Sequence, residues 1–293
     1  MPMATRSTSS SSAVQLAALP VRWLQQRWQQ MPAAFVGLLT ILIYLLLAIF
    51  GEAIAPHPYT EQNLAVILQP PSIHHLFGTD QFGRDIFSRV VVGSRSIMLI
   101  AGTATLLSLL VGGAVGLVAG FVGGLWDEAL MRITDLLLSF PALLLALLII
   151  STLGSDLIYL VLTTVVVFAP GIARVVRSET LNLVTKEFIE AARVVGVPAH
   201  RILLYHLLPN LSNLLVVEGS IYFSYTIMIS AGLGFLGLGV QPPSPDWGLQ
   251  INDGRNVILT AWWVTAFPSF AMASLVLGVN LFADGLTRRQ MQR

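Results

Sequence analysis

The sequence predicts an all-α integral membrane protein with six transmembrane helices. Of its 293 residues 55% are hydrophobic and only 11% are charged, whereas an ordinary soluble domain has about 25% charged residues. The apolar residues gather in six blocks, each near the roughly 20 residues that a helix needs to cross a bilayer. Cysteine is absent, which excludes disulfides and thiolate metal sites. No Gly-Lys-Ser or Gly-Lys-Thr occurs, so a P-loop for nucleotide is absent too.

The first unit, residues 1–30, is expected to be a cytoplasmic tail with an interfacial helix. A serine-rich run over residues 7–12 cannot bury a core, while Trp23 and Trp28 are typical anchors at a membrane surface. A partly ordered leader is the open alternative for this segment.

The second unit, residues 31–92, combines the first span with an external loop. The span covers about Ala33–Phe50 and is uncharged. Ala53-Ile54-Ala55 resembles a signal-peptidase site, but the apolar stretch is longer than the roughly 7 to 15 residues of a signal peptide. We therefore expect a retained anchor.

The third unit, residues 93–286, is predicted to hold five further spans, and residues 287–293 a cytoplasmic C-terminus. Pro141 and Pro170 fall inside two of these spans and predict kinks. A stripe of glycines at four-residue steps would let another helix approach closely. We expect that helix to belong to this chain and not to another subunit. The five spans are Ser96–Phe121, Ala129–Leu153, Leu157–Val176, Leu211–Leu238 and Trp262–Leu281, and the stripe is Gly112, Gly116, Gly120 and Gly124.

The distribution of arginine and lysine predicts the orientation. Twelve of the sixteen basic residues fall on the side of the amino terminus, which the positive-inside rule assigns to the cytoplasm. Both termini and the stretch 186–210 are therefore expected there. The other four are Arg84, Arg89, Arg95 and Arg255.

The stretch 186–210 is the longest charged run between two apolar blocks. Its first half has helical spacing, with apolar and charged side chains on different faces, and Gly196 followed by Pro198 predicts its end. A second short helix is expected from Ala199 until Pro209 and Asn210 break it. The apolar face is Phe188, Ala191, Ala192 and Val195; the charged residues are Glu187, Glu190 and Arg193. On periodicity alone, a membrane-surface helix without a protein partner is an equal alternative.

The spacing of the motifs carries a family resemblance. Glu190-Ala191-Ala192, Gly196 and the run 206–209 (HLLP) resemble the EAA loop of the membrane subunits of bacterial ABC importers. His206 replaces the usual isoleucine, which is similar to the peptide and nickel importer branch and its C-type subunits. Three further stretches resemble that branch: residues 77–85 (FGTDQFGRD), 127–141, and 234–239 followed by QPPSPDWG.

The resemblance implies a permease subunit of an ATP-driven, binding-protein-dependent importer in the bacterial inner membrane. The expected cargo is a dipeptide, an oligopeptide or a related small solute such as a nickel complex. The implied partners are a second related permease, forming a heterodimer, two cytoplasmic ATPases that bind ATP and Mg, and an external solute-binding protein; no nucleic acid is implied. The chain itself would have no catalytic residues and no cofactor. The residues implied in ATPase coupling are Glu187, Glu190, Ala191, Ala192, Gly196, Arg201, His206 and Pro209.

The external loop has mixed charge, from Asp80, Arg84 and Asp85 around Gly83. This pattern favours internal salt bridges over a ligand site, although the resemblance also allows contact with the solute-binding protein. Adjacent histidines at positions 74 and 75 point apart and have no third ligand nearby in the sequence, so we expect no metal site.

Ionisable residues inside predicted spans receive a functional interpretation by default. Asp135 is expected to pair locally with Arg132, three residues earlier. Glu218 has no local partner and is a candidate for the translocation path near the cytoplasmic mouth.

Two other classes of protein require features that the sequence lacks. An ion-coupled secondary carrier would need polar groups near mid-membrane and an inverted repeat, and no repeat is evident. An intramembrane enzyme would need paired aspartates, a serine with a histidine, or a His-Glu-x-x-His helix, and the predicted spans contain none of these.

Overall fold

The computed structural model describes the backbone of residues 11–290 and the side chains of residues 33–287. Within these residues the protein is helical, without strands, apart from one isolated bridge between Thr79 and Asp85. Residues 1–10 and 291–293 lie outside the described residues. The side chains of Trp23 and Trp28, which are predicted to anchor the chain at the membrane surface, also lie outside the described set.

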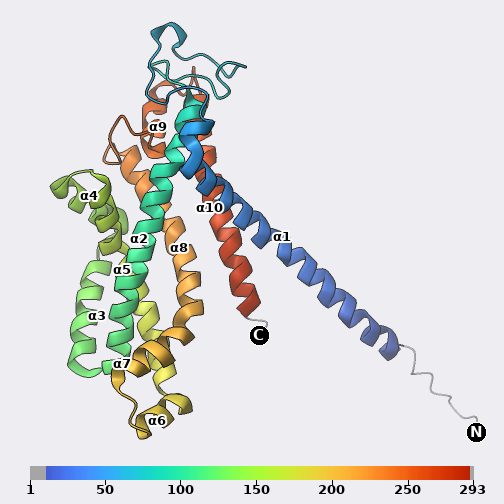
Figure 1. Cartoon of the computed structure of the whole chain (residues 1–293), viewed down its shortest axis with the longest axis vertical. Coiled ribbons are helices and arrows are strands. Elements are labelled where there is room, and N and C mark those ends of the chain that lie inside the picture. The colour runs from blue at the N-terminus through green and yellow to red at the C-terminus, as the bar shows by residue number, and fades with distance from the viewer. Residues whose placement is uncertain (1–10, 291–293) are drawn as a thin grey trace, which may run out of the picture.

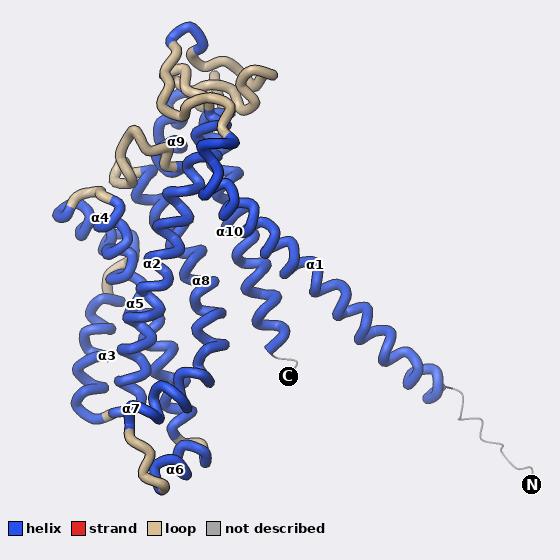
Figure 2. Tube along the Cα trace, viewed as in Figure 1, coloured by secondary structure: helices blue, strands red, loops and turns tan. Residues whose placement is uncertain are grey.

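Most of the long helices lie along the long axis of the molecule, whereas the N-terminal helix runs obliquely away from them (Figures 1 and 2). One end carries the loop after α1 together with α9, and the other carries α6 and α7. The α-helices are α1 (Ser11–Ile54), α2 (Ile86–Val122), α3 (Gly124–Leu138), α4 (Ala142–Leu153), α5 (Leu157–Val184), α6 (Glu187–Val194), α7 (Ala199–Arg201), α8 (Leu208–Phe235), α9 (Trp247–Gly254) and α10 (Trp263–Gln290). Two short 3₁₀ helices, η1 (Leu64–Val66) and η3 (Arg255–Val257), and a π-helical segment, η2 (Ile202–Leu207), complete the set.

Five helical segments are long and apolar enough to cross a membrane, and α3 with α4 makes a sixth if this bent pair counts as one span. The bend between α3 and α4 is 89°. Pro141 lies at this break as the N-cap of α4, because proline has no N–H with which to continue the hydrogen bonding of α3. The predicted span Ala129–Leu153 is therefore two helices at a near right angle, and not one kinked helix.

The N-terminal helix is longer than predicted. α1 runs without a break from Ser11 to Ile54, so the expected interfacial helix and the first span share one backbone helix. α1 contacts α2 and α10. The first residues of α1 and the last residues of α10 both point toward the end of the bundle that carries α6 (Figure 1).

The glycine stripe of α2 faces α5 within the same chain. A Cβ atom added at Gly112 or at Gly116 would overlap a carbonyl oxygen of α5, and one at Gly120 would lie 2.7 Å from the Cβ of Thr180. These three glycines allow the two helices to approach closely. The prediction that Gly124 shares this contact is wrong: Gly124 begins α3 at a φ of +60° with open space beside it, because the turn between α2 and α3 carries it off the α2 face.

Large apolar side chains cover the outside of the bundle. Phe35 and Ile49 on α1 are 66% and 63% exposed, and Leu106 and Leu110 on α2 are 58% and 59% exposed. Such a surface would be unfavourable in water and suits contact with lipid chains. The fold is therefore that of an α-helical integral membrane protein.

Candidate coupling site and external loop

The helix α6 begins and ends as its sequence predicts. Glu187 and Glu190 lie in its first turn, where carboxylates interact favourably with the positive end of the helix dipole. At the other end the backbone N–H of Gly196 donates to the carbonyl of Arg193, and that of Val197 donates to the carbonyl of Ala192, both at 3.0 Å. Gly196 has a φ of +81°. This is a Schellman ending, which favours glycine at that position.

The buried face of α6 differs from the predicted one. Ile189 and Ala192 are buried, whereas Phe188 is 42% and Val195 82% exposed. Ile189 and Ala192, three residues apart, join an apolar cluster with side chains of α2, α5, α8 and η2. The cluster also contains Leu117, Ile172, Val176, Ile202, Leu207 and Leu211. These contacts attach α6 firmly to the end of the bundle.

The opposite face of α6 does not pack against the bundle and is exposed. Glu187, Glu190 and Ala191 are exposed. Arg193 lies over the ring of Phe121, with its guanidinium carbon 5.4 Å from the ring centre, and no ion pair joins it to Glu190 among the described side chains. The Glu190 carboxylate is therefore available to a partner.

The segment after α6 is continuous with a membrane helix, so the predicted break at Pro209 and Asn210 is wrong. α7, the π-helical segment 202–207 and α8 follow one another without a loop. Pro209 follows directly after the π-helical segment, whose altered backbone hydrogen bonding accommodates the missing N–H. The side-chain amide of Asn210 donates to the carbonyl of His206 at 2.6 Å. Arg201 is exposed and His206 is half-buried.

Two ion pairs join α3 to α5. Nη2 of Arg174 donates to Oδ1 of Asp135 at 2.6 Å. Arg177 forms a two-pronged pair with Asp127, whose second contact, from Nη2 to Oδ2, is 2.6 Å long. The predicted local pairing of Asp135 with Arg132 is wrong, because the fold brings α5 within reach of the carboxylate. Residue spacing within one helix does not reveal the pair between Asp135 and Arg174. The available signal in the sequence was that two neighbouring apolar segments carry side chains of opposite charge.

Glu218 lies half-buried on α8, one turn before Tyr222. Within residues 33–287 it forms no ion pair. The hydroxyl of Tyr222 occupies the space that a side chain at position 171 of α5 would fill. A role for Glu218 in the translocation path stays a prediction.

The charges of the external loop pair among themselves. Asp80 and Arg84 are buried, and Nε of Arg84 donates to Oδ2 of Asp80 at 2.5 Å. Nη2 of Arg84 also lies 3.5 Å from Oδ2 of Asp253 on α9, a partner that sequence spacing did not reveal. Gly83 turns the chain between them at a φ of +69°. These pairs fix the loop against α9.

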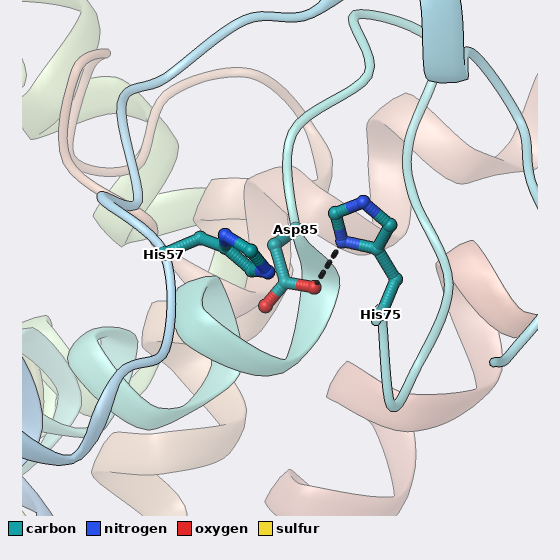
Figure 3. A group of neighbouring side chains, drawn as sticks. All are labelled: His57, His75 and Asp85. Carbon is teal, nitrogen blue, oxygen red and sulfur yellow. Dashed lines mark hydrogen bonds and ion pairs between the residues drawn. The ribbon is translucent and has the colours of Figure 1, made fainter. Parts of the chain in front are cut away.

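His75 has two further metal-ligating side chains near it, contrary to the prediction that no third ligand lies nearby. The fold brings His57 and Asp85 to His75, although they are far from it in the sequence, whereas His74 stays outside the group (Figure 3). Nδ1 of His75 lies 2.9 Å from Oδ1 of Asp85. Asp85 also caps α2, because its Oδ2 accepts from the backbone N–H of Ser88 at 2.8 Å.

The QPPSPDWG stretch attaches α9 to the bundle. Asp246 caps α9 by accepting from the backbone N–H of Leu249 at 2.8 Å, and its burial raises the pKa of this carboxyl to about 6. Trp247 is fully buried and donates from Nε1 to the carbonyl of Val90 at 2.9 Å. These residues have a structural role at the end of the bundle that carries α9.

Two known families match separate parts of the chain. The family described as "binding-protein-dependent transport system inner membrane component" matches residues 112–293. The family described as "N-terminal TM domain of oligopeptide transport permease C" matches residues 25–71.

Several bacterial transport proteins are similar in sequence to most of the chain. The chain is 41% identical to the dipeptide transport system permease protein DppC of Alkalihalophilus pseudofirmus, over 86% of this chain and 83% of the relative. It is 36% identical to the di/tripeptide transport system permease protein DppC of Pseudomonas aeruginosa, over 91% and 90%. It is 39% identical to the glutathione transport system permease protein GsiD of Escherichia coli, over 90% and 87%.

These matches distinguish an ABC importer permease from an ion-coupled carrier. They favour a multi-pass permease of the cytoplasmic membrane that works with an ATPase and a solute-binding protein, and they give no support to an ion-coupled carrier. The ATPase activity of such importers resides on partner subunits. The chain belongs to the family of inner-membrane components of binding-protein-dependent ABC importers.

Proposed function

We propose that this permease carries short peptides and that α6 transmits the closure of a cytoplasmic ATPase to the membrane helices. The names of the relatives favour a peptide over a nickel complex as cargo. The observation that carries the coupling role is the two-sided character of α6. Ile189 and Ala192 attach it to the bundle, while Glu187 and Glu190 remain exposed for a partner.

The proposal places both termini and α6 in the cytoplasm. The excess of arginine and lysine on that side supports this orientation, as does the position of α6 at the end toward which α1 and α10 point (Figure 1). ATP and Mg then bind to two ATPase subunits beneath the membrane. A second, related permease completes the path as the other half of a heterodimer.

At the external end the proposal assigns contact with the solute-binding protein to exposed apolar side chains. Asp80, Arg84 and Asp85 are buried and are poor candidates for that contact. Exposed apolar residues in the loop before α2 and in the connection between η3 and α10 offer a surface to a partner. They are Leu64, Ile73, Leu259 and Trp262, with exposures of 75%, 95%, 97% and 56%.

The coupling role is tested by solute-stimulated ATPase activity of the assembled importer in lipid nanodiscs. Glu190→Lys reverses the charge offered to the ATPase, and Gly196→Pro cannot adopt the φ of +81° that ends α6. Both variants should assemble and lose the stimulation. Glu128→Lys is the matched control, since it reverses an exposed carboxylate on α3. Wild-type stimulation in both coupling variants would refute the assigned role.

The cargo is tested separately, by copurifying the complex with its binding protein and identifying the bound solute by mass spectrometry. A peptide of a few residues is the expected result. A metal chelate in its place would overturn the assignment of cargo and leave the coupling role intact.

A further inference from the structure

Three side chains with metal-ligating atoms meet in the external loop. His57, His75 and Asp85 each present one such atom, and the three atoms lie within 4.8 Å of one another. Figure 3 shows the two imidazole rings flanking the carboxylate of Asp85. The residues come from three places in the chain, just after α1, the middle of the loop and the residue before α2.

Asp85 is a buried carboxylate, with its side chain 1% exposed. Its Oδ2 atom is fully used, because it accepts from the backbone N–H and from the hydroxyl of Ser88, both at 2.8 Å. Its Oδ1 atom faces Nδ1 of His75 at 2.9 Å. A buried carboxylate is stable only with a compensating positive charge or a full set of donors.

The arginines of the loop do not provide that charge. Arg84 pairs with Asp80 and Asp253, and Nε of Arg89 lies 3.9 Å from Oδ2 of Asp80. Two arginines therefore balance two other aspartates. Among the described side chains the ion-pair partner of Asp85 is His75 alone. The site thus has room for one positive charge at Oδ1, carried either by a proton on the imidazole or by a cation between the ligands.

We propose that His57, His75 and Asp85 bind a divalent cation of the zinc class. Two imidazole nitrogens and one carboxylate oxygen are an established ligand combination for Zn²⁺, which leaves a fourth position to water. Ligand atoms around Zn²⁺ lie roughly 3.3 Å apart, given bond lengths of about 2.0–2.1 Å. Rotation of two half-buried imidazoles can close the present separation, because both histidines lie in loop segments.

Binding would have a mechanical effect at the external end. The backbone N–H of His57 already donates to Oγ of Ser88 at 3.2 Å, and its Nε2 lies 3.0 Å from the carbonyl of His74. A cation at this point would tie the end of α1, the loop and the start of α2 together. The site stands independently of which solute is carried.

The test measures Zn²⁺ on the purified importer complex in nanodiscs, after chelator treatment and equilibration with ZnCl₂. Wild type should hold one more equivalent per permease chain than His57→Ala or His75→Ala. Loss of a residue that only hydrogen-bonds to a metal ligand lowers metal affinity by roughly 10- to 100-fold. Because His57 and His75 would be ligands themselves, Zn²⁺ affinity should fall by at least this factor in each variant. His74→Ala is the matched control, because its ring lies outside the group. Co²⁺ in place of Zn²⁺ should give visible absorption bands that disappear in the same two variants.

Equal Zn²⁺ content in wild type and His57→Ala would overturn the proposal, because His57 would then not be a ligand. An equal loss of binding in His74→Ala would also overturn it, since the cation would then lie elsewhere. His57→Ala keeps the backbone contact to Ser88. It therefore decides the question even if His75→Ala fails to assemble.

Discussion

Replacing Gly116 by alanine should force α2 away from α5. The added Cβ atom would overlap the carbonyl oxygen of Ala173 and would lie 2.9 Å both from the backbone nitrogen of Arg177 and from the Cβ of Val176. Two of these three atoms belong to the backbone, so the clash cannot be relieved by a side-chain rotation. The helices themselves must shift.

The magnitude follows from comparison with a matched glycine. Inserting a methyl group into a packed contact costs about 1–3 kcal/mol, while alanine in a helix is favoured over glycine by about 1 kcal/mol. Gly113 lies on the same helix, and a Cβ there would meet only a side-chain atom of Leu215 at 3.6 Å, an ordinary contact. The gain in helix propensity is common to both variants. Gly116→Ala should therefore be less stable than Gly113→Ala by about 1–3 kcal/mol.

Unfolding of the purified chain in mixed detergent micelles, followed by tryptophan fluorescence, measures this difference. Gly113→Ala is expected at or slightly above the wild-type midpoint, and Gly116→Ala clearly below it. Coincident midpoints for the two alanine variants would show that α2 and α5 do not meet at this glycine, and would refute the packing argument.

Three further predictions concern α6, the ion pairs and the external end. Ile189→Ala truncates a fully buried side chain at a cost of about 2–5 kcal/mol in packing. It should reduce solute-stimulated ATPase activity, while Ile189→Val should largely keep it. Full stimulation in the alanine variant would contradict the role of this contact. Asp127→Asn and Arg177→Gln should show a coupling energy on the order of 1 kcal/mol in a double-mutant cycle of unfolding, and strict additivity would show that the pair does not stabilise the fold. Burial raises the pKa of Asp246 to about 6, so the stabilising contribution of its protonated form is present at low pH and is lost as pH rises through about 6. Asp246→Asn should then be more stable than wild type by up to about 3 kcal/mol at pH 7.5 and by less at pH 5, and a difference independent of pH would exclude this carboxyl as the cause.

Hydropathy was sufficient to predict where the membrane spans lie, but it did not predict where the helices break. An apolar helix in lipid has little alternative to crossing it, so the positions of α2, α5, α8 and α10 follow from composition alone. The effect of a proline depends on what precedes it. Pro141 separates two helices at 89°, whereas Pro209 is accommodated because the altered hydrogen bonding of the preceding π-helical segment tolerates its missing N–H.

Contacts between side chains that are distant in the sequence were also not predicted. Local spacing suggested that Asp135 would take a partner from its own helix, but Arg174 of α5 is the residue within reach. The ligand group in the external loop escaped prediction for the same reason, since His57 lies 18 residues before His75. Such contacts depend on how helices pack, which periodicity within one helix does not report. By contrast, the Schellman ending at Gly196 is a local matter, and the sequence alone predicted where α6 ends.

The continuity of α7, η2 and α8 makes this segment a lever. Its 37 residues from Ala199 to Phe235 span about 55 Å at the helical rise per residue. A tilt of about 10° at the end next to α6 would then carry the far end sideways by about 10 Å. The only non-α segment in the lever is η2, directly beside the buried contacts of α6. If α6 meets the ATPase as proposed above, the stiffness of the six π-helical residues of η2 would set how much of a displacement at α6 reaches α9 at the other end.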